Sequence, residues 1–151
     1  MKLNDLIRVE RCRILQSRTK TEVLHELIEV AAREEAVSDI DGLEREIFYR
    51  EQIMSTGIGR KIGIPHVRFA GVKEPMILVG IRPEGIPDYE SLDGELVTMV
   101  FMILVGEDQH KEYLRILSLL VHRLKEESVR AALQSSETAE DIRAGIVGGI
   151  S

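Results

Sequence analysis

The sequence has 151 residues, 44% hydrophobic and 30% charged, which is the balance of an ordinary globular protein with one hydrophobic core. Its net charge of −6 argues against general affinity for nucleic acid or an anionic membrane, because both need a basic surface. No apolar run reaches the ~20 residues of a membrane helix, and the lone cysteine cannot form an internal disulfide, so we expect one cytoplasmic domain over residues 1–151.

Residues 1–33 predict a short helical turn, an apolar-polar segment and an amphipathic helix. Thr19 and Glu22 fit a capping box, in which a hydroxyl and a carboxylate satisfy free amides at a helix start. Apolar residues then recur at helical spacing to about residue 33. Cys12 stands between two arginines, whose charges favour a reactive thiolate. With no partner histidine nearby, we interpret Cys12 as a small, semi-buried residue.

A second helix is predicted from Ser38, as its N-terminal cap, to about Met54. Its apolar stripe includes Ile47, and Arg50 follows three residues later. The helix therefore carries the Arg50 guanidinium out at its end, toward the next segment. A planar guanidinium is suited to phosphate oxygens, so Arg50 is a candidate for phosphate stabilisation.

A turn rich in glycine and hydroxyl groups follows, with the sequence Ser-Thr-Gly-Ile-Gly. Gly57 and Gly59 allow a backbone course that brings amide N–H groups close to an anion, and Ser55 and Thr56 add hydroxyl donors. We predict that these four residues bind phosphate. The turn is not a nucleotide-binding P-loop, which needs four residues between its glycines and a Lys followed by Ser or Thr.

His66 ends the extended segment that follows this turn. From Arg50 to Arg68 the chain has four cationic side chains against one carboxylate, a local charge of +3. A histidine after proline is more often structural than functional. Beside an anion-binding turn and local positive charge, however, it suggests a nitrogen nucleophile that takes up a phosphoryl group. Positioning and charge neutralisation are the main demands of such a transfer, so no metal or cofactor is required in principle.

The remaining chain alternates strands and helices. Two apolar runs predict strands covered on both faces, Met76–Ile81 and Leu96–Val105. Residues 82–91 contain Pro and Gly and predict a loop. Helices are expected at residues 109–124, 128–133 and 137–146, and residues 145–151 are expected to fray. Helices before, between and after buried strands indicate an α/β fold, a single domain with one sheet covered on both faces.

Arg50, the Ser-Thr-Gly-Ile-Gly turn and the Ile64-Pro65-His66 ending together resemble the signature of the fructose/mannitol-type IIA proteins of the bacterial sugar phosphotransferase system. That family includes the freestanding nitrogen-regulatory IIA proteins. The resemblance extends over nearly the whole chain. It implies a mixed β-sheet flanked by helices, phosphorylation of His66, and an active-site position for Arg50 close to His66.

The sequence departs from this family at two places. Family members usually have Asn-Gly where this chain has Arg60-Lys61, a change that restricts the backbone and adds charge for anion binding or partner choice. They also commonly carry a second active-site histidine, and Tyr113 stands at its position here. His110 lies one turn earlier on the same helix face. It remains open whether His110 or Tyr113 replaces that histidine, or whether His110 is only a polar residue near a helix start.

We therefore expect a phosphocarrier that accepts a phosphoryl group on His66 from the phosphocarrier protein HPr or a paralogue. In the resembled family, sugar-type members pass the group to a IIB partner, whereas nitrogen-regulatory members use it to change which proteins they bind. The lack of an attached IIB or membrane IIC segment favours the regulatory branch. The alternative is a degenerate binding module that keeps the fold and the anion pocket but transfers no phosphate onward.

Overall fold

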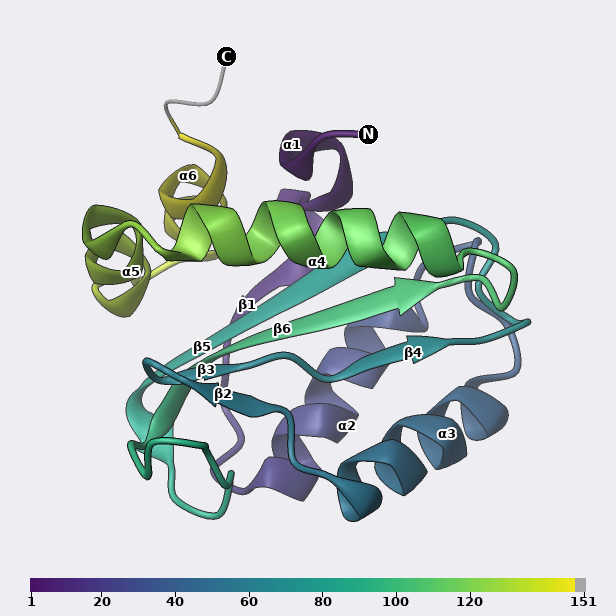
Figure 1. Cartoon of the computed structure of the whole chain (residues 1–151), viewed down its shortest axis with the longest axis horizontal. Helices are drawn as coiled ribbons and strands as arrows, with labels where there is room; N and C mark the ends of the chain where they lie inside the picture. Colours follow the sequence, from purple (N-terminus) through teal and green to yellow (C-terminus); the bar gives the residue numbers. More distant parts are fainter. Residues whose placement is uncertain (149–151) are drawn as a thin grey trace.

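The computed structural model describes residues 1–148, and a six-stranded sheet lies at its centre (Figure 1). The strands are β1 (Cys12–Ile14), β2 (Gly57–Gly59), β3 (Ile62–Gly63), β4 (His66–Arg68), β5 (Met76–Ile86) and β6 (Val97–Val105). Their order is β1-β5-β6-β3-β2, and β4 also pairs with β6. β5 and β6 are antiparallel, as are β2 and β3, whereas the pairs β1–β5, β3–β6 and β4–β6 are parallel. The sheet is therefore mixed.

Helices cover both faces of this sheet (Figure 1). They are α1 (Leu3–Leu6), α2 (Lys20–Ala31), α3 (Ile40–Ile53), α4 (His110–Leu124), α5 (Glu127–Gln134) and α6 (Ala139–Val147), with a 3-10 turn η1 (Val9–Arg11). α2 and α3 pack with one face in one hydrophobic cluster, and α1, α4, α5 and α6 pack with the other. Strand β6 is buried along its whole length, which explains its unbroken apolar run. The predicted α/β architecture is confirmed.

Of the two predicted N-terminal helix caps, the structure has the first, and a neighbouring residue takes the place of the second. Thr19 caps α2 as expected, since its Oγ1 accepts a hydrogen bond from the Glu22 amide at 3.2 Å. The cap of α3 is Asp39 instead of Ser38, because the Asp39 carboxylate accepts from the Gly42 amide. The Ser38 amide and hydroxyl both donate to the carbonyl of Gly71, so Ser38 joins α3 to the segment after β4.

The predicted loop at residues 82–91 begins later than expected. Strand β5 continues through Pro83 to Ile86, which pairs with Val97 of β6. The pairing register shifts between Ile81 and Ile86, and such an irregularity tolerates a proline that has no N–H to donate. The Pro83 carbonyl accepts from the side chain of Gln134, which connects this irregular stretch to α5.

The expected fraying of residues 145–151 is wrong for its first part. Helix α6 extends to Val147, and Ile146 is fully buried. The Arg123 guanidinium donates to the Ile146 carbonyl at 2.6 Å and to the Gly148 carbonyl at 2.6 Å, so a side chain of α4 holds the helix end. Residues 149–151 lie outside the described part of the chain.

An interrupted strand beside β6 places the candidate nucleophile. β3 pairs with Met99 and Val100 of β6, and β4 pairs farther along the same edge with residues 103–105. Between them, Ile64 and Pro65 break the strand, and His66 begins the second piece.

None of the helices within residues 1–148 has the length and apolar character needed to cross a membrane.

Candidate active site

The His66 imidazole is held by a backbone hydrogen bond. Its Nδ1 lies 2.9 Å from the carbonyl oxygen of Ile64, two residues earlier in the chain. A carbonyl oxygen can only accept, so the hydrogen of this bond belongs to Nδ1. In the neutral ring the lone pair then lies on Nε2. The geometry therefore leaves Nε2 as the ring nitrogen with a free lone pair, a choice that the sequence left open.

Tyr113 of α4 lies directly against His66. The two rings are stacked, with centroids 5.0 Å apart and planes 24° from parallel. Burial raises the pKa of the Tyr113 phenol above its ordinary value, although the nearby charges of Arg50 and Arg68 lower it. The phenol therefore stays neutral near pH 7. The structure brings Tyr113 to His66 at the place where the resemblance implied a second histidine.

His110 takes a more peripheral position on α4. It is exposed, and its ring centroid lies 6.3 Å from that of Tyr113. Among the described residues, those that line the cleft around His66 include Tyr113 but not His110. His110 thus flanks the Tyr113 ring from the start of α4.

Two arginines on different elements lie near enough for their charges to act on Tyr113. Arg50 lies in the last turn of α3, lines the same cleft as His66, and makes an i,i+4 ion pair through Nε with Glu46 at 3.3 Å. That pair leaves the terminal nitrogens of the guanidinium for other acceptors. Arg68 lies two residues beyond His66 on β4, so the two side chains share one face of the strand. The alternation of strand residues is the signal that could have identified Arg68.

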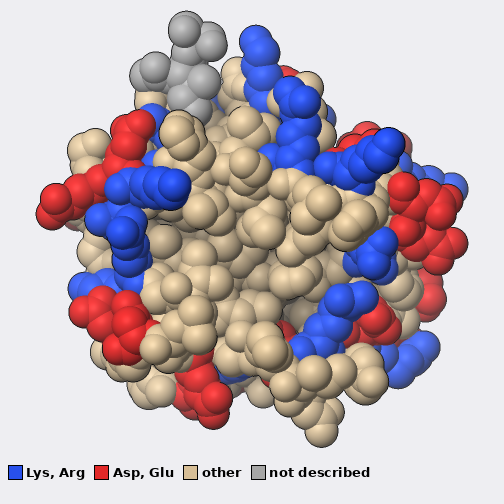
Figure 2. Space-filling model, viewed as in Figure 1, with Lys and Arg blue, Asp and Glu red and all other residues tan. Residues whose placement is uncertain are grey.

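His66 lies in a cleft of about 550 Å³ between α3, α4 and the β2–β3 hairpin. Much of its lining is apolar, and several of these side chains are exposed at the rim: Ile53 is 65% exposed, Met54 74% and Ile58 42%. On the molecular face that carries α4 and strands β2 to β4, uncharged side chains cover a broad central area and charged side chains gather around it (Figure 2). Large exposed apolar side chains beside a reactive group are typical of a surface that docks another protein.

The predicted phosphate-binding turn makes bonds within the protein. The Ser55 hydroxyl donates to the Glu90 carbonyl at 2.7 Å, and the Thr56 amide and hydroxyl donate to Glu51. The Gly59 amide donates to the Ser91 hydroxyl. A Cβ at Gly57 would lie 2.1 Å from the Glu90 carbonyl oxygen, so glycine permits the close approach of the loop after β5. The phosphate-binding role of Ser55, Thr56, Gly57 and Gly59 stays a prediction.

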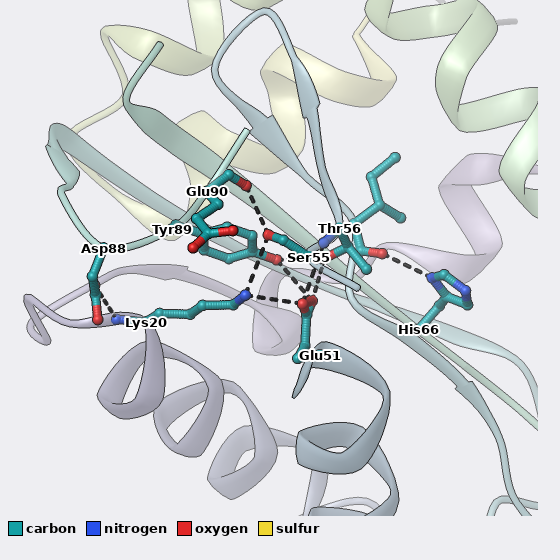
Figure 3. A network of polar contacts seen from close by, with 9 residues as sticks. Lys20, Glu51, Ser55, Thr56, His66, Asp88, Tyr89 and Glu90 are labelled. Atoms are coloured by element: carbon teal, nitrogen blue, oxygen red, sulfur yellow. Dashed lines mark hydrogen bonds and ion pairs between the residues drawn. The ribbon is translucent and has the colours of Figure 1, made fainter. Parts of the chain in front are cut away.

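Glu51 is a site residue that the sequence reasoning missed. Its carboxylate is only 5% exposed and pairs with the ammonium of Lys20 at 3.1 Å. It also accepts from Thr56 and from the Tyr89 hydroxyl, and Figure 3 shows these groups converging on it. A signal existed, because Glu51 follows Ile47 by four residues and so continues the buried stripe of α3.

Metal binding and thiol chemistry are two further possibilities to compare with the structure. Within residues 1–148, no group of three or more His, Cys, Asp or Glu residues is arranged to hold a metal ion. Cys12 is buried, and burial raises the pKa of its thiol to about 12, although Arg143 lowers it. The structure thus places Cys12 in the hydrophobic core as a small residue, more fully buried than the semi-buried position expected.

Known structures share this fold. The nitrogen regulatory protein IIA-Ntr of Neisseria meningitidis aligns with a TM-score of 0.85 and 27% identity, over 95% of this chain and 97% of that protein. The mannitol enzyme IIA of Escherichia coli, solved in complex with phosphorylated mannitol enzyme IIB, aligns with a TM-score of 0.77 and 20% identity, over 92% of this chain and 95% of that one. The second likeness, at this low identity, shows the fold alone.

Sequence relatives come from both regulatory and sugar systems. A nitrogen regulatory protein of Pseudomonas aeruginosa is 34% identical over 122 residues, covering 81% of this chain and 79% of the relative. The fructose-specific EIIABC component of Bacillus subtilis is 34% identical over 143 residues, covering 94% of this chain but only 22% of that relative. The family model for the phosphoenolpyruvate-dependent sugar phosphotransferase system, EIIA 2, matches residues 5–147. This chain therefore belongs to the EIIA 2 family of the phosphoenolpyruvate-dependent sugar phosphotransferase system.

Proposed function

We propose that this protein is a phosphocarrier that accepts a phosphoryl group on Nε2 of His66 from HPr or a paralogue. The observation that carries the proposal is the 2.9 Å contact between Nδ1 of His66 and the Ile64 carbonyl oxygen. This contact selects the Nδ1–H tautomer and leaves the Nε2 lone pair as the nucleophile in a cleft shared with Arg50. Family membership supports the same chemistry.

The transfer step follows from this arrangement. The Nε2 lone pair attacks phosphorus, the bond between phosphorus and the donor breaks, and the electron pair of that bond leaves with the donor. Nδ1 keeps its proton, and the Ile64 carbonyl stabilises the positive charge that develops on the phosphorylated ring. The Arg50 guanidinium neutralises charge on the phosphoryl oxygens, and Arg68 adds a second positive charge.

The rim of the cleft supports a protein as the phosphoryl donor. Ile53, Met54 and Ile58 are exposed around the cleft that contains His66. A docked protein surface would remove these side chains from water and would exclude water from the transfer, which limits hydrolysis of the phosphoryl group. A small phosphorylated metabolite would leave much of this apolar rim uncovered.

We propose regulation as the leading role of the phosphorylated form. Phosphorylation would place a dianionic group in a surface framed by apolar side chains, and this change would alter which protein docks there. The likeness to nitrogen regulatory proteins supports this role. Relay of the phosphoryl group to a IIB domain is the alternative, supported by the equally identical fructose-specific relative.

A degenerate binding module is the second candidate function, and Tyr113 is the observation that favours it. A neutral phenol stacked on His66 cannot supply the positive charge that a protonated second histidine could. Under this alternative the protein exchanges no phosphate with a phosphorylated IIB domain. Tyr113→His should restore exchange if the missing histidine is the cause, and exchange by the wild type would exclude the alternative.

Incubation with phosphoenolpyruvate, enzyme I and HPr, followed by intact-mass analysis without acid, tests the leading proposal. We expect one added phosphoryl group on the wild type and none on His66→Ala. Arg50→Ala should slow the addition about 100-fold, the effect of removing one charge-stabilising donor from a transition state. His25→Ala, which replaces a histidine on α2, should leave it unchanged. Absence of phosphorylation on folded wild type with its cognate HPr would contradict the proposal.

A further inference from the structure

A buried carboxylate on the wall of the cleft has no role in the transfer step described above. Glu51 continues a helix stripe that is otherwise apolar, and its side chain is 5% exposed. Removing a carboxylate from water is costly, and a well-packed apolar residue is often at least as stabilising as a buried ion pair. Glu51 beside His66 therefore calls for an explanation other than general stability.

The partners of Glu51 come from three segments of the chain. Lys20 at the start of α2 contributes its ammonium at 3.1 Å, and Tyr89 from the loop after β5 contributes its hydroxyl at 3.2 Å. Thr56 donates from both its amide and its hydroxyl. Tyr89 is 2% exposed, and its hydroxyl also lies 2.6 Å from the Thr56 hydroxyl. The Lys20 ammonium packs over the Tyr89 ring at 4.5 Å. Thr56 is thus fixed from several sides.

A series of hydrogen bonds continues from Thr56 to the nucleophile. The Thr56 carbonyl accepts from the Ile64 amide at 3.0 Å. The Ile64 carbonyl in turn accepts from Nδ1 of His66 at 2.9 Å. Figure 3 shows Glu51, Thr56 and His66 arranged in this sequence, with Lys20 and Tyr89 on the far side of Glu51. The position of the carbonyl that fixes the His66 tautomer therefore depends on the position of Thr56.

We propose that Glu51 is a positioning residue for His66. Through Thr56 and Ile64 it keeps the imidazole in the Nδ1–H tautomer, with the lone pair on Nε2. Lys20 and Tyr89 hold the carboxylate in place for this task. The inference rests on the proposed function, because it gives His66 its role as nucleophile, and it adds how the correct nitrogen is selected.

The test compares Glu51→Gln with the wild type by nitrogen-15 NMR of the His66 ring, assigned through His66→Gln. Glutamine keeps the size of the side chain but presents an amino group to donors that need an acceptor. We expect the wild type to show a protonated Nδ1 alone, and Glu51→Gln to show both tautomers. With phosphorylated HPr, kcat should fall about 10- to 100-fold, the scale expected for a misplaced reacting group. KM should stay nearly constant, because Glu51 is buried.

Glu26→Gln is the matched control. Glu26, like Glu51, is a buried carboxylate with a cationic partner, here Arg13, but it accepts from the amides of Gln16 and Ser17 instead of from Thr56 and Tyr89. Its replacement should lower stability without changing the tautomer of His66. An equal tautomer change in both variants would overturn the proposal, as would an unchanged tautomer and kcat in Glu51→Gln.

Tyr89→Phe covers the case in which Glu51→Gln does not fold. It removes one hydroxyl and should shift the tautomer population in the same direction by a smaller amount; an unchanged population would overturn the proposal. The NMR comparison needs no phosphoryl donor. If HPr does not phosphorylate the wild type, the proposed function fails, whereas the tautomer measurement still decides the role of Glu51.

Discussion

Tyr113 stacks on His66, at the position where the resemblance implied a second histidine. Burial raises the pKa of its phenol, which is therefore neutral near pH 7 and adds no charge beside the imidazole. Two restraints then act on the His66 ring. The Ile64 carbonyl fixes one edge of the ring, and the Tyr113 ring covers one face. At the scale of single residues, the structure therefore restrains the orientation of the imidazole and places a neutral phenol where the resemblance implied a second titrating group.

This reading predicts different results for Tyr113→Phe and Tyr113→Ala. Phenylalanine keeps the stacked ring, so the rate of phosphorylation by HPr should change by no more than about twofold. Alanine removes a contact worth about 0.5–1.5 kcal/mol, so the rate should fall about 2- to 12-fold. The rates are measured by intact mass over time. A Phe variant as slow as the Ala variant would show that the hydroxyl, and not the stacking, is what the reaction uses.

The β2–β3 hairpin shows the physical meaning of the Arg60-Lys61 departure. Both residues lie in the left-handed region, with φ of 55° and 69°, and they connect strands that end at Gly59 and restart at Ile62. Positive φ at both central residues is the signature of a type I′ turn, for which Asn-Gly is the favoured pair. A side chain with a Cβ costs about 1–2 kcal/mol in this region. The hairpin therefore carries strain at an exposed, doubly charged tip.

Replacing the pair with Arg60→Asn and Lys61→Gly should relieve this strain. We expect the free energy of unfolding to rise by about 1 kcal/mol, since part of the gain is offset by the greater freedom of glycine in the unfolded chain. Urea unfolding measures it, as a higher midpoint with an unchanged slope. Lys73→Gly, at an exposed lysine without positive φ, should instead destabilise the protein. If Lys73→Gly and the Arg60→Asn/Lys61→Gly variant changed the free energy of unfolding equally, the turn would be unstrained.

Elements with a strong local pattern could be predicted from the sequence. The apolar run of β6 and the Thr19 cap of α2 depend on neighbouring residues, and both are present in the structure. The extension of β5 through Pro83 could not be predicted in this way, because it depends on pairing of Ile86 with Val97 after an irregular stretch. Local composition indicated a loop there, and a long-range strand pairing overrode it.

In the candidate site, too, residues close together in the sequence could be identified, and residues brought together only by folding could not. His66 and Arg50 were identifiable because one short segment contains both, and the position of Tyr113 followed from the resemblance. The network around Glu51 was not identifiable, because Lys20 and Tyr89 are far from it in the sequence and reach it only in the folded chain. Likewise, the Ser55 hydroxyl and the Gly59 amide bond to Glu90 and Ser91 in the loop after β5. No local sequence pattern predicted the path of that loop.

At the scale of the whole molecule, two largely buried carboxylates join the N-terminal segment to the body of the protein. Glu34 accepts two hydrogen bonds from the guanidinium of Arg11, which is 1% exposed, and these bonds are the main cause that lowers the pKa of Glu34. Burial alone would raise the pKa of Glu26, but hydrogen bonds from Ser17, Gln16 and Arg13 outweigh it and the pKa is lowered. Both groups favour the folded state in their charged form.

Acid should therefore destabilise this protein through these carboxylates. A pKa that is lower in the folded state than in the unfolded state contributes stability above the unfolded value, about 4.3 for glutamate, and that contribution is lost as pH falls through the folded value. We expect the urea midpoint to be nearly constant from pH 7 to 5 and to decline below about pH 4.5. Glu34→Gln should lower the midpoint at pH 7 and make the decline shallower, because one of the titrating groups is gone. An acid slope identical to that of the wild type would show that the Arg11–Glu34 pair does not govern this response, which would then belong to the remaining carboxylates.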